Sequence, residues 1–221
     1  MPDPTTIPVS LISEFLHSAL HEIGGSTGRI HRIAALLECR GDGVNEELRS
    51  WLQHMRTATT SLDDSLKAVR RYMEAFDLPS EQSTFSFSEA AEAAATALGV
   101  AIKISGEWPE LKANRPRVEL VLRELIDNAA KFQDGTPLDI RVKSIVERGQ
   151  ELISVADNGI GIEPRHSERI FKPFVRLWGD RFSGPGLGLT IARMLVQQWN
   201  GRIWLEPLPR SGSVFSFTFP T

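Results

Sequence analysis

Residues 123–132 read RELIDNAAKF, the first of four short patches in the second half of the chain that bear on its function. In a helix, Glu124, Asn128 and Lys131 are spaced four and three residues apart and share one face. The opposite face is apolar and comprises Val121, Leu122, Leu125, Ile126 and Ala129. A carboxylate, an amide and a lysine in one row suit a magnesium ion and its phosphates. A solvated helix face explains the same row equally well.

The second patch, DNGIGI at residues 157–162, directly follows a predicted strand. One interpretation is a hairpin turn, because Asn-Gly between apolar runs favours hairpins. The other interpretation is a base-binding site. Asp157 would then accept hydrogen bonds from an adenine amine, while Gly159 and Gly161 would let the backbone approach the base.

The remaining two patches lie close together. IFKPFVRL, at residues 170–177, contains two phenylalanines that would be either core residues or the hinge of a lid. GPGLGL, at residues 184–189, leads into a predicted helix. Glycines before a helix N-terminus leave backbone N–H groups open to phosphate. Each patch alone is a weak indication of function.

In this order and spacing, the four patches resemble the N, G1, F and G2 boxes of histidine kinases. The superfamily of these boxes also includes gyrase, Hsp90 and MutL ATPases. The resemblance covers about residues 85–221, and we place an ATP-binding catalytic domain at residues 84–221. It implies a mixed sheet with helices on one face, and ATP with Mg²⁺ held between the helices and a mobile lid.

The resemblance also implies roles for individual residues. By motif match, Asn128 would be the magnesium ligand, Asp157 the adenine ligand and Lys131 a phosphate contact. Five glycines would shape either the base site or the phosphate loop: Gly159, Gly161, Gly184, Gly186 and Gly188.

Glu124 departs from the kinase pattern, because many histidine kinases have an asparagine at its position. In ATPases of the superfamily, a glutamate there activates water. Glu124 is therefore a candidate catalytic residue, and an ATPase with a conformational output is one alternative to a kinase.

The pattern around the four patches predicts an α+β fold. The sequence predicts strands at residues 85–87, which alternate, and at residues 100–105, 138–146, 151–156, 202–205 and 214–219. Helical patterns cover residues 88–99, 117–132 and 189–199. Such a mixture indicates a two-layer α/β sandwich. Leu78-Pro79-Ser80 and the polar residues after it predict a linker before this domain.

The first part of the chain predicts a helical hairpin at residues 10–79, after a tail at residues 1–9. The first helix has an apolar seam at Ile12, Leu16, Ala19, Ile23, Ser26, Ile30, Ile33 and Leu37. The second keeps a heptad rhythm at Leu48, Leu52, Met55, Thr59, Leu62, Leu66, Val69, Met73 and Phe76. GDGVN at residues 41–45 separates the helices, with Asn45 as N-cap. One hairpin cannot cover both seams, so we expect a homodimer with a four-helix bundle.

This hairpin is similar to the dimerisation and histidine-phosphotransfer hairpin of the same kinases. It holds four of the five histidines, which are His17, His21, His31 and His54. Glu22 follows His21, as in the family's His-Glu pair. The resemblance implies that His21 accepts phosphate while Glu22 takes its proton. Gly25 and Ser26 depart from the family, which usually has Thr or Asn and then Pro at these places.

The sequence therefore predicts a two-component histidine kinase that phosphorylates itself on His21. The phosphate would then pass to an aspartate on a response-regulator receiver domain. Besides the ATPase, a second alternative is a non-catalytic phosphotransfer or scaffold protein that resembles a kinase.

Composition limits the other partners. The chain has 221 residues and a formal net charge of −3, which provides no strong attraction for nucleic acid or an anionic membrane. Cys39 is the single cysteine, so an internal disulfide and a cysteine-based zinc cluster are excluded. No apolar run approaches the ~20 residues of a membrane span. We therefore expect a cytoplasmic protein with no membrane segment in this chain.

Overall fold

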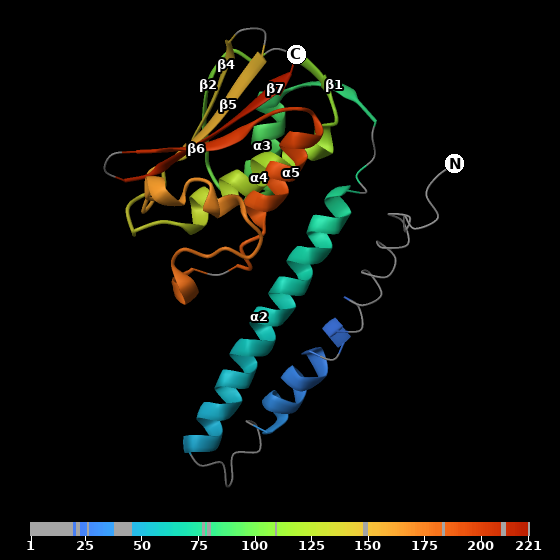
Figure 1. The fold of residues 1–221 in the computed structure, drawn as a ribbon, viewed down its shortest axis with the longest axis vertical. Helices are drawn as coiled ribbons and strands as arrows, with labels where there is room; N and C mark the ends of the chain where they lie inside the picture. The colour runs from blue at the N-terminus through green and yellow to red at the C-terminus, as the bar shows by residue number, and fades with distance from the viewer. Residues whose placement is uncertain are drawn as a thin grey trace. The chain divides into compact units, whose positions relative to one another are not determined.

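A computed structural model describes residues 20, 23–25, 27–37, 46–76, 78, 81–108, 110–147, 150–182, 184–208 and 211–220. The chain divides into two compact units, Met1–Glu74 and Ala75–Thr221, which are described separately below (Figure 1). Several residues of interest lie outside the described residues: His17, His21, Glu22, Ser26, Cys39 and Asn45.

The first unit consists of two helical stretches. Residues 27–37 are helical, as are residues 20 and 23–25 before them. The second stretch is helix α2 (Glu46–Phe76), whose first turn carries Glu46 and Glu47. Acidic side chains there interact favourably with the N-terminal end of the helix dipole.

The two helices face each other through rows of small or apolar residues. On the first helix the buried row is Leu20, Thr27 and Ala34, at a spacing of seven. The hydroxyl of Thr59 in α2 lies 3.5 Å from Nδ1 of His31 on the first helix. A seven-residue spacing keeps one row turned towards the neighbouring helix along its length.

The large apolar residues of the predicted seam of the first helix are not covered within the single hairpin. Its described apolar members, Ile23, Ile30, Ile33 and Leu37, are exposed in the single chain. The helix turns its Leu20 row towards α2 instead. The heptad positions of α2 divide in the same way: Leu52, Thr59 and Met73 are buried, while Leu48, Met55 and Leu62 are exposed.

Three glycines of the first helix have room for a side chain. A Cβ on Gly24 would lie 4.0 Å from Leu66 Cδ1, and one on Gly25 would lie 3.8 Å from Arg29 Nη1. A Cβ on Gly28 would meet no heavy atom within 4 Å. Close packing among the described residues therefore does not require glycine at these positions.

The second unit is built on a five-stranded sheet in the order β2-β4-β5-β7-β6. Its strands are β2 (Lys103–Gly106), β4 (Arg141–Glu147), β5 (Gln150–Asp157), β6 (Ile203–Pro207) and β7 (Ser213–Pro220). β2 and β4 are parallel, and the other pairs are antiparallel. A separate antiparallel pair joins β1 (Ser83–Ser86) to β3 (Glu110–Ala113), a strand that the sequence did not predict.

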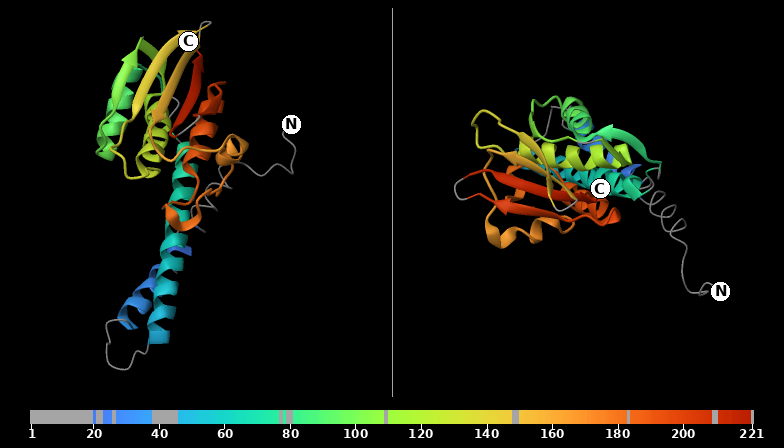
Figure 2. Two further views of the ribbon diagram at one scale, coloured as in Figure 1. Left: turned by 90° about the vertical axis from the view of Figure 1, so that its left-hand side faces the viewer. Right: turned by 90° about the horizontal axis from the view of Figure 1, so that it is seen from above.

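Three helices lie over one face of the five-stranded sheet (Figures 1 and 2). They are α3 (Phe87–Leu98), α4 (Arg115–Lys131) and α5 (Gly188–Gln198). α3 begins earlier than predicted because the Ser86 hydroxyl, rather than Ser88, caps it by accepting from the Ser88 N–H at 3.2 Å. The observed fold confirms the predicted α+β class, with helices followed by a mixed sheet.

The buried faces of these elements form a single apolar core. Phe87 of α3 packs edge-on against Phe217 and Phe219 of β7, with ring centroids 6.3 and 5.6 Å apart. The apolar face of α4 is buried as predicted, and its members are Val121, Leu122, Leu125, Ile126 and Ala129. α4 and β5 are thereby fixed, and their C-terminal ends carry the motifs described next.

Between β5 and α5 the chain forms three short 3₁₀ turns that the sequence did not predict. They are η1 (Pro164–His166), η2 (Arg169–Phe171) and η3 (Gly179–Arg181). In the part of the chain that the structure describes, no helix combines the length and apolar character needed to cross a bilayer.

Candidate functional site

Asp157 is the last residue of β5, where it pairs with Ser213 of β7. Its Oδ1 accepts a hydrogen bond of 2.8 Å from the Gly159 N–H. Burial raises the pKa of the Asp157 carboxyl, and hydrogen bonds from the Gly159 and Ser213 backbones partly offset this effect. A ligand group that donates a hydrogen bond to this carboxylate would compensate for its lost hydration.

The loop after Asp157 is held by close backbone contacts rather than by a hairpin. A Cβ on Gly159 would lie 2.2 Å from the Phe132 carbonyl oxygen, so only glycine fits there. The Ile160 N–H donates to that same carbonyl at 3.0 Å. β5 pairs with β4 and β7, whereas the next strand, β6, pairs only with β7. The hairpin interpretation of Asn-Gly is therefore wrong.

Gly212, in the turn between β6 and β7, completes this arrangement. Its φ is +83°, and a Cβ there would lie 2.1 Å from the Asp157 carbonyl oxygen. Its N–H donates to the Gly159 carbonyl at 2.7 Å. Gly161 also has a positive φ, of 74°. The end of α4, the end of β5 and the β6–β7 turn are thus joined around Asp157.

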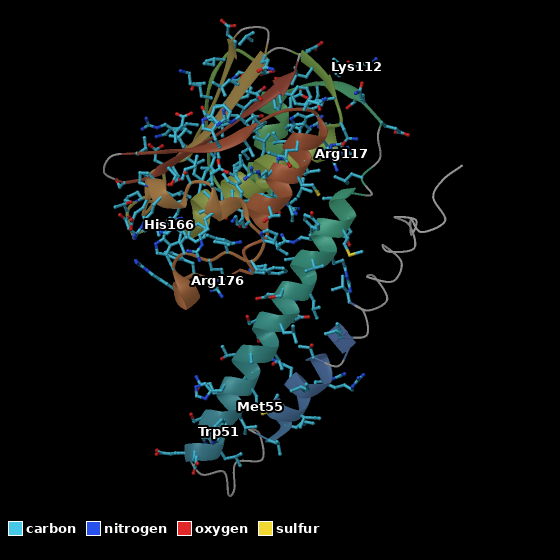
Figure 3. The ribbon with its side chains drawn as sticks, viewed as in Figure 1. Trp51, Met55, Lys112, Arg117, His166 and Arg176 are labelled. Carbon is cyan, nitrogen blue, oxygen red and sulfur yellow. The ribbon has the colours of Figure 1, made fainter. Side chains whose placement is uncertain are left out.

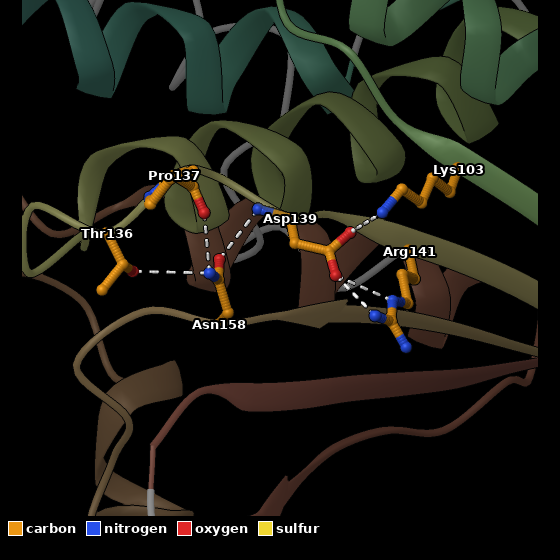
Figure 4. Close-up of polar contacts among 6 residues, drawn as sticks. All are labelled: Lys103, Thr136, Pro137, Asp139, Arg141 and Asn158. Atoms are coloured by element: carbon orange, nitrogen blue, oxygen red, sulfur yellow. Dashed lines mark hydrogen bonds and ion pairs between the residues drawn. The ribbon is translucent and has the colours of Figure 1, made fainter.

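Asn158 secures the outer side of the same loop (Figure 4). Its carboxamide oxygen accepts from the Asp139 N–H at 2.8 Å. Its Nδ2 donates to the Pro137 carbonyl at 2.8 Å and lies 3.4 Å from the Thr136 hydroxyl. The side chain therefore ties the end of β5 to the segment before β4.

Asp139 continues this network towards β2 and β4 (Figure 4). Its carboxylate lies 2.6 Å from the Arg141 guanidinium and 2.8 Å from the Lys103 ammonium. Hydrogen bonds from Arg141 and then from Lys103 lower the pKa of Asp139 to about 2. The carboxylate consequently keeps its charge, and the network its ion pairs, throughout the neutral and mildly acidic range.

We expect Asn158→Ala to lower the free energy of unfolding by about 1–2 kcal/mol, since it removes hydrogen bonds to two backbone groups. The urea midpoint measures this loss. A matched control is Gln150→Ala, which truncates an exposed polar side chain at the other end of β5. Equal urea midpoints for the two variants would show that the Asn158 side chain does not stabilise the folded domain.

α4 carries the other polar residues of the site. Glu124 is only 4% exposed, so the solvated-face interpretation is wrong for this residue. Its Oε2 lies 2.5 Å from the point that a Cβ on Gly188 would occupy, and Asn128 Nδ2 lies 3.9 Å from that point. Glu124 and Asn128 therefore face the N-terminus of α5.

Lys131 follows on the same helix and forms an ion pair with Asp127. Its Nζ also lies 3.9 Å from the position of a Cβ on Gly184. The lysine thus reaches the first glycine of the GPGLGL stretch.

That stretch has the backbone of a glycine loop that leads into a helix. Gly184 and Gly186 have φ values of +121° and +75°. α5 begins at Gly188, and its N-cap residue, Leu187, makes no side-chain capping hydrogen bond. In the described part of the chain, the N–H groups of the first turn of α5 therefore lack a side-chain cap. Such a helix end can bind an anion.

The two phenylalanines of IFKPFVRL have different roles. Phe171 is buried and packs edge-on against Phe215, with ring centroids 6.4 Å apart. Phe174 is 55% exposed and has a φ of +60°, which is unusual for a bulky side chain. Its N–H donates to the Gly186 carbonyl at 3.0 Å. Phe171 therefore belongs to the core, while Phe174 lies near the start of the segment that we call the 172–187 loop.

The side chain of Asn128 suits a phosphate-bearing ligand and its metal ion, because the Nδ2 group can donate to a phosphate oxygen and the carboxamide oxygen can bind the metal. Asn128 Nδ2 is buried without a hydrogen-bond partner among the residues that the structure describes. Within the same residues, no group of three or more His, Cys, Asp or Glu side chains could enclose a metal ion. Magnesium commonly uses one or two protein ligands and completes its shell with phosphate oxygens and water.

Comparison with protein families matches residues 113–221 to the histidine kinase-, DNA gyrase B-, and HSP90-like ATPases. The C-terminal domain belongs to this ATPase family. The matched region begins at the end of β3 and includes every polar and glycine residue of the site described above except Lys103.

Similarity to named proteins extends over both units of the chain. The chain is 26% identical to the phytochrome-like protein Cph1 of Synechocystis, over 95% of this chain and 29% of that protein. It is 30% identical to the methanogenesis regulatory histidine kinase FilI of Methanothrix harundinacea, over 96% of this chain and 24% of that protein. The chain thus spans between 24% and 29% of the length of these two relatives.

The fold of this chain is also found in a solved structure. Full-length ShkA in complex with AMPPNP superposes with a TM-score of 0.64 at 24% sequence identity. The match covers 94% of this chain and 45% of ShkA. At this identity the likeness concerns the fold alone.

The structure brings together most of the residues that the sequence singled out. Asp157, Gly159 and Gly161 form one group, and Glu124, Asn128 and Gly188 form another. Sequence reasoning missed Gly212, Asn158 and the carbonyl of Phe132. Gly212 had one local signal, which is its place between two serines in the stretch that separates the last two predicted strands.

Proposed function

We propose that this chain is the core of a sensor histidine kinase, which binds ATP with Mg²⁺ in its second unit and phosphorylates His21. The observation that carries the proposal is the placement of Glu124 and Asn128 against the uncapped N-terminus of α5. In an ATPase-family domain, this arrangement suits a polyphosphate and its metal ion. The similarity to FilI over 96% of the chain supports extending the proposal to the hairpin.

Each binding residue has a chemical role in the proposed complex. Asp157 accepts a hydrogen bond from the adenine amine, and Gly159 and Gly161 leave space for the base. Asn128 offers its carboxamide oxygen to the metal ion, which when bound neutralises phosphate charge. Lys131 and the N–H groups at the start of α5 hold phosphate oxygens.

The proposed transfer is an in-line displacement on the γ-phosphorus. An imidazole nitrogen of His21 forms a bond to phosphorus, the bond to the bridging oxygen breaks, and ADP leaves. Glu22 accepts the imidazole proton. Positioning and charge stabilisation provide most of the rate enhancement in phosphoryl transfer. The phosphorylated histidine then donates its phosphoryl group to an aspartate of a response-regulator receiver domain.

Glu124 favours a second candidate, an ATPase with a conformational output. Its buried carboxylate lies where α4 meets the start of α5, a place from which it could activate water. A third candidate is a scaffold or phosphotransfer protein without ATP chemistry, which Gly25 and Ser26 favour because they depart from the kinase pattern.

Incubation with γ-phosphate-labelled ATP separates the three candidates. Label on the protein that a receiver domain can remove indicates a kinase. Free labelled phosphate without labelled protein indicates an ATPase. The absence of both would contradict the proposal and favour the scaffold.

We further propose that the hairpin pairs with a second copy of itself. The supporting observation is that both helices expose apolar rows at a spacing of seven: Ile23, Ile30 and Leu37 on the first, and Leu48, Met55 and Leu62 on α2. Trp51, 62% exposed, lies on the same helix as Met55 (Figure 3). Two hairpins that face each other would bury these rows in a four-helix bundle.

We expect residues 1–79 to dimerise at micromolar concentration and residues 84–221 to remain monomeric in sedimentation equilibrium. Replacing both Met55 and Leu62 by Glu should dissociate the full chain, because buried charges on the apolar row are costly. The matched control is Thr60→Glu, on an exposed position of the same helix. A monomeric wild type would contradict the bundle.

A further inference from the structure

Two side chains at the start of α4 bind the segment that leads from α2 into β1. We call this segment, residues 77–82, the linker. Nη2 of Arg117 donates to the Leu78 carbonyl at 2.9 Å. Nδ2 of Asn114 donates to the Glu81 carbonyl, also at 2.9 Å. One helix end therefore holds the linker at two of its backbone carbonyls.

Arg117, labelled in Figure 3, also joins the linker to α5. Its Nη1 donates at 3.0 Å to the side-chain oxygen of Gln198, the last residue of α5. The guanidinium is half-buried, and its Nε is buried without a hydrogen-bond partner among the residues that the structure describes. Partial burial of a charged group is costly, so the bonds to Leu78 and Gln198 have to offset it. The rigid fork of donors in arginine suits a side chain that binds two segments at once.

Asn114 holds the linker with one end of its carboxamide and α4 with the other. Its Oδ1 caps the helix by accepting from the Arg117 N–H at 3.0 Å, so the two residues that bind the linker are coupled through the first turn of α4. The residue before Asn114, Ala113, ends β3 and pairs with Ser83, the first residue of β1. The linker is thus held at Leu78 and Glu81 by α4, and where it ends by β3.

We propose that Arg117 and Asn114 are positioning residues for phosphoryl transfer, because they fix the point at which the linker enters the ATP-binding unit. This inference rests on the proposed kinase function. In that function, one unit binds the γ-phosphate, the other carries the accepting histidine, and the linker joins them. The rate of transfer then depends on the effective concentration of one group at the other, which a shorter and more restrained tether raises.

Release of the linker would lengthen this tether. With both bonds in place, one residue separates the end of α2 at Phe76 from Leu78, the first residue that α4 holds. Without them, the next fixed point is the start of β1 at Ser83. Effective concentration falls roughly as the −3/2 power of tether length, or more steeply. We therefore expect release to slow the transfer and to leave ATP binding unchanged, since neither residue belongs to the proposed ATP site.

Single-turnover labelling with saturating γ-phosphate-labelled ATP tests the positioning. R117M keeps a long side chain and loses both donors, while N114D keeps the cap acceptor and loses the donor to Glu81. The double variant should take label about fivefold more slowly than the wild type, and each single variant should lie between them. Calorimetry should give ATP affinities within about twofold of the wild type. The matched control is R115A, which should change neither quantity, because Arg115 pairs with Glu119 at 2.7 Å instead of the linker.

Cleavage by a glutamyl endopeptidase after Glu81 measures release of the linker without ATP. The carbonyl of that peptide bond is the one that Asn114 holds. Cleavage of a segment that opens transiently follows the population of its open form. The double variant should be cut at Glu81 about tenfold faster, the effect expected for the loss of these hydrogen bonds. Mass spectrometry identifies the fragments 1–81 and 82–221, and R115A should be cut at the wild-type rate.

Four results would overturn the inference. Cleavage of the double variant at the wild-type rate would mean that these residues do not hold the linker. Faster cleavage with unchanged labelling would mean that the held linker does not position the phosphate. Faster labelling would mean that the held linker opposes transfer, and weaker ATP binding would mean that the two residues act on the nucleotide site. If the wild type takes no label, the proposed function fails and the positioning role with it, whereas cleavage still shows whether the two residues hold the linker.

Discussion

His21→Gln should abolish the incorporation of γ-phosphate into the protein and leave its affinity for ATP unchanged. Glutamine keeps a polar side chain of similar length but has no nucleophilic nitrogen, so no phosphorus–nitrogen bond can form. We expect the loss of label to be complete, because no other residue replaces an acceptor held in line with the γ-phosphorus. Autoradiography of the protein after incubation with labelled ATP measures it.

The chemistry of the label identifies the acceptor independently. Phosphohistidine is labile in acid and stable in alkali, so the wild-type label should behave in this way. The matched control is His31→Gln, since His31 faces Thr59 inside the hairpin. Full labelling of the His21 variant would show that another histidine accepts the phosphoryl group.

Asp157→Asn should weaken ATP binding by about a hundredfold or more while the domain stays folded. The carboxamide has no negative charge, and in one orientation it turns its own N–H donor towards the adenine amine. In either orientation the half-buried, charge-assisted hydrogen bond to the adenine is lost. Asn128→Asp should have a similar effect, because it removes the carboxamide at the proposed metal position. Calorimetry gives the affinities, and circular dichroism checks the fold.

Asp134→Asn is the matched control for Asp157→Asn, since Asp134 is an exposed carboxylate that accepts a hydrogen bond from the Thr136 hydroxyl. Its affinity should equal that of the wild type. Unchanged affinity in a folded Asp157 variant would show that the adenine is bound elsewhere.

The periodic segments of this chain could be predicted well from the sequence. The apolar face of α4 and the strands that alternate or run apolar matched the structure because burial on one face leaves a direct pattern. β3 escaped prediction because it is a four-residue strand that pairs with β1 outside the main sheet. The 3₁₀ turns escaped because one turn is too short to carry a period.

The candidate site was predictable where a residue's chemistry is visible locally. Glycines beside a carboxylate indicate close approach of a ligand, and glycines before a helix indicate phosphate binding, without any knowledge of the tertiary fold. Gly212 and Phe132 give no such indication, since each acts through a backbone contact with a loop distant in sequence. Such contacts follow from the tertiary fold and leave no spacing pattern.

The seam of the first helix illustrates another limit. In the proposed four-helix bundle, each helix needs two apolar rows, one for its hairpin neighbour and one for the other hairpin. The sequence showed the large residues at Ile23, Ile30 and Leu37, but the hairpin buries the smaller row of Leu20, Thr27 and Ala34. Residue size therefore identifies an apolar row without saying which neighbour it faces.

The three glycines of the first helix have a consequence for its local stability. Gly24, Gly25 and Gly28 together lower the intrinsic helix stability by about 3 kcal/mol relative to alanine. The helical state there consequently depends on the packing of Leu20, Thr27 and Ala34. Helix formation and hairpin closure in this stretch are one cooperative unit, so opening the hairpin melts the segment and exposes its amides to hydrogen exchange.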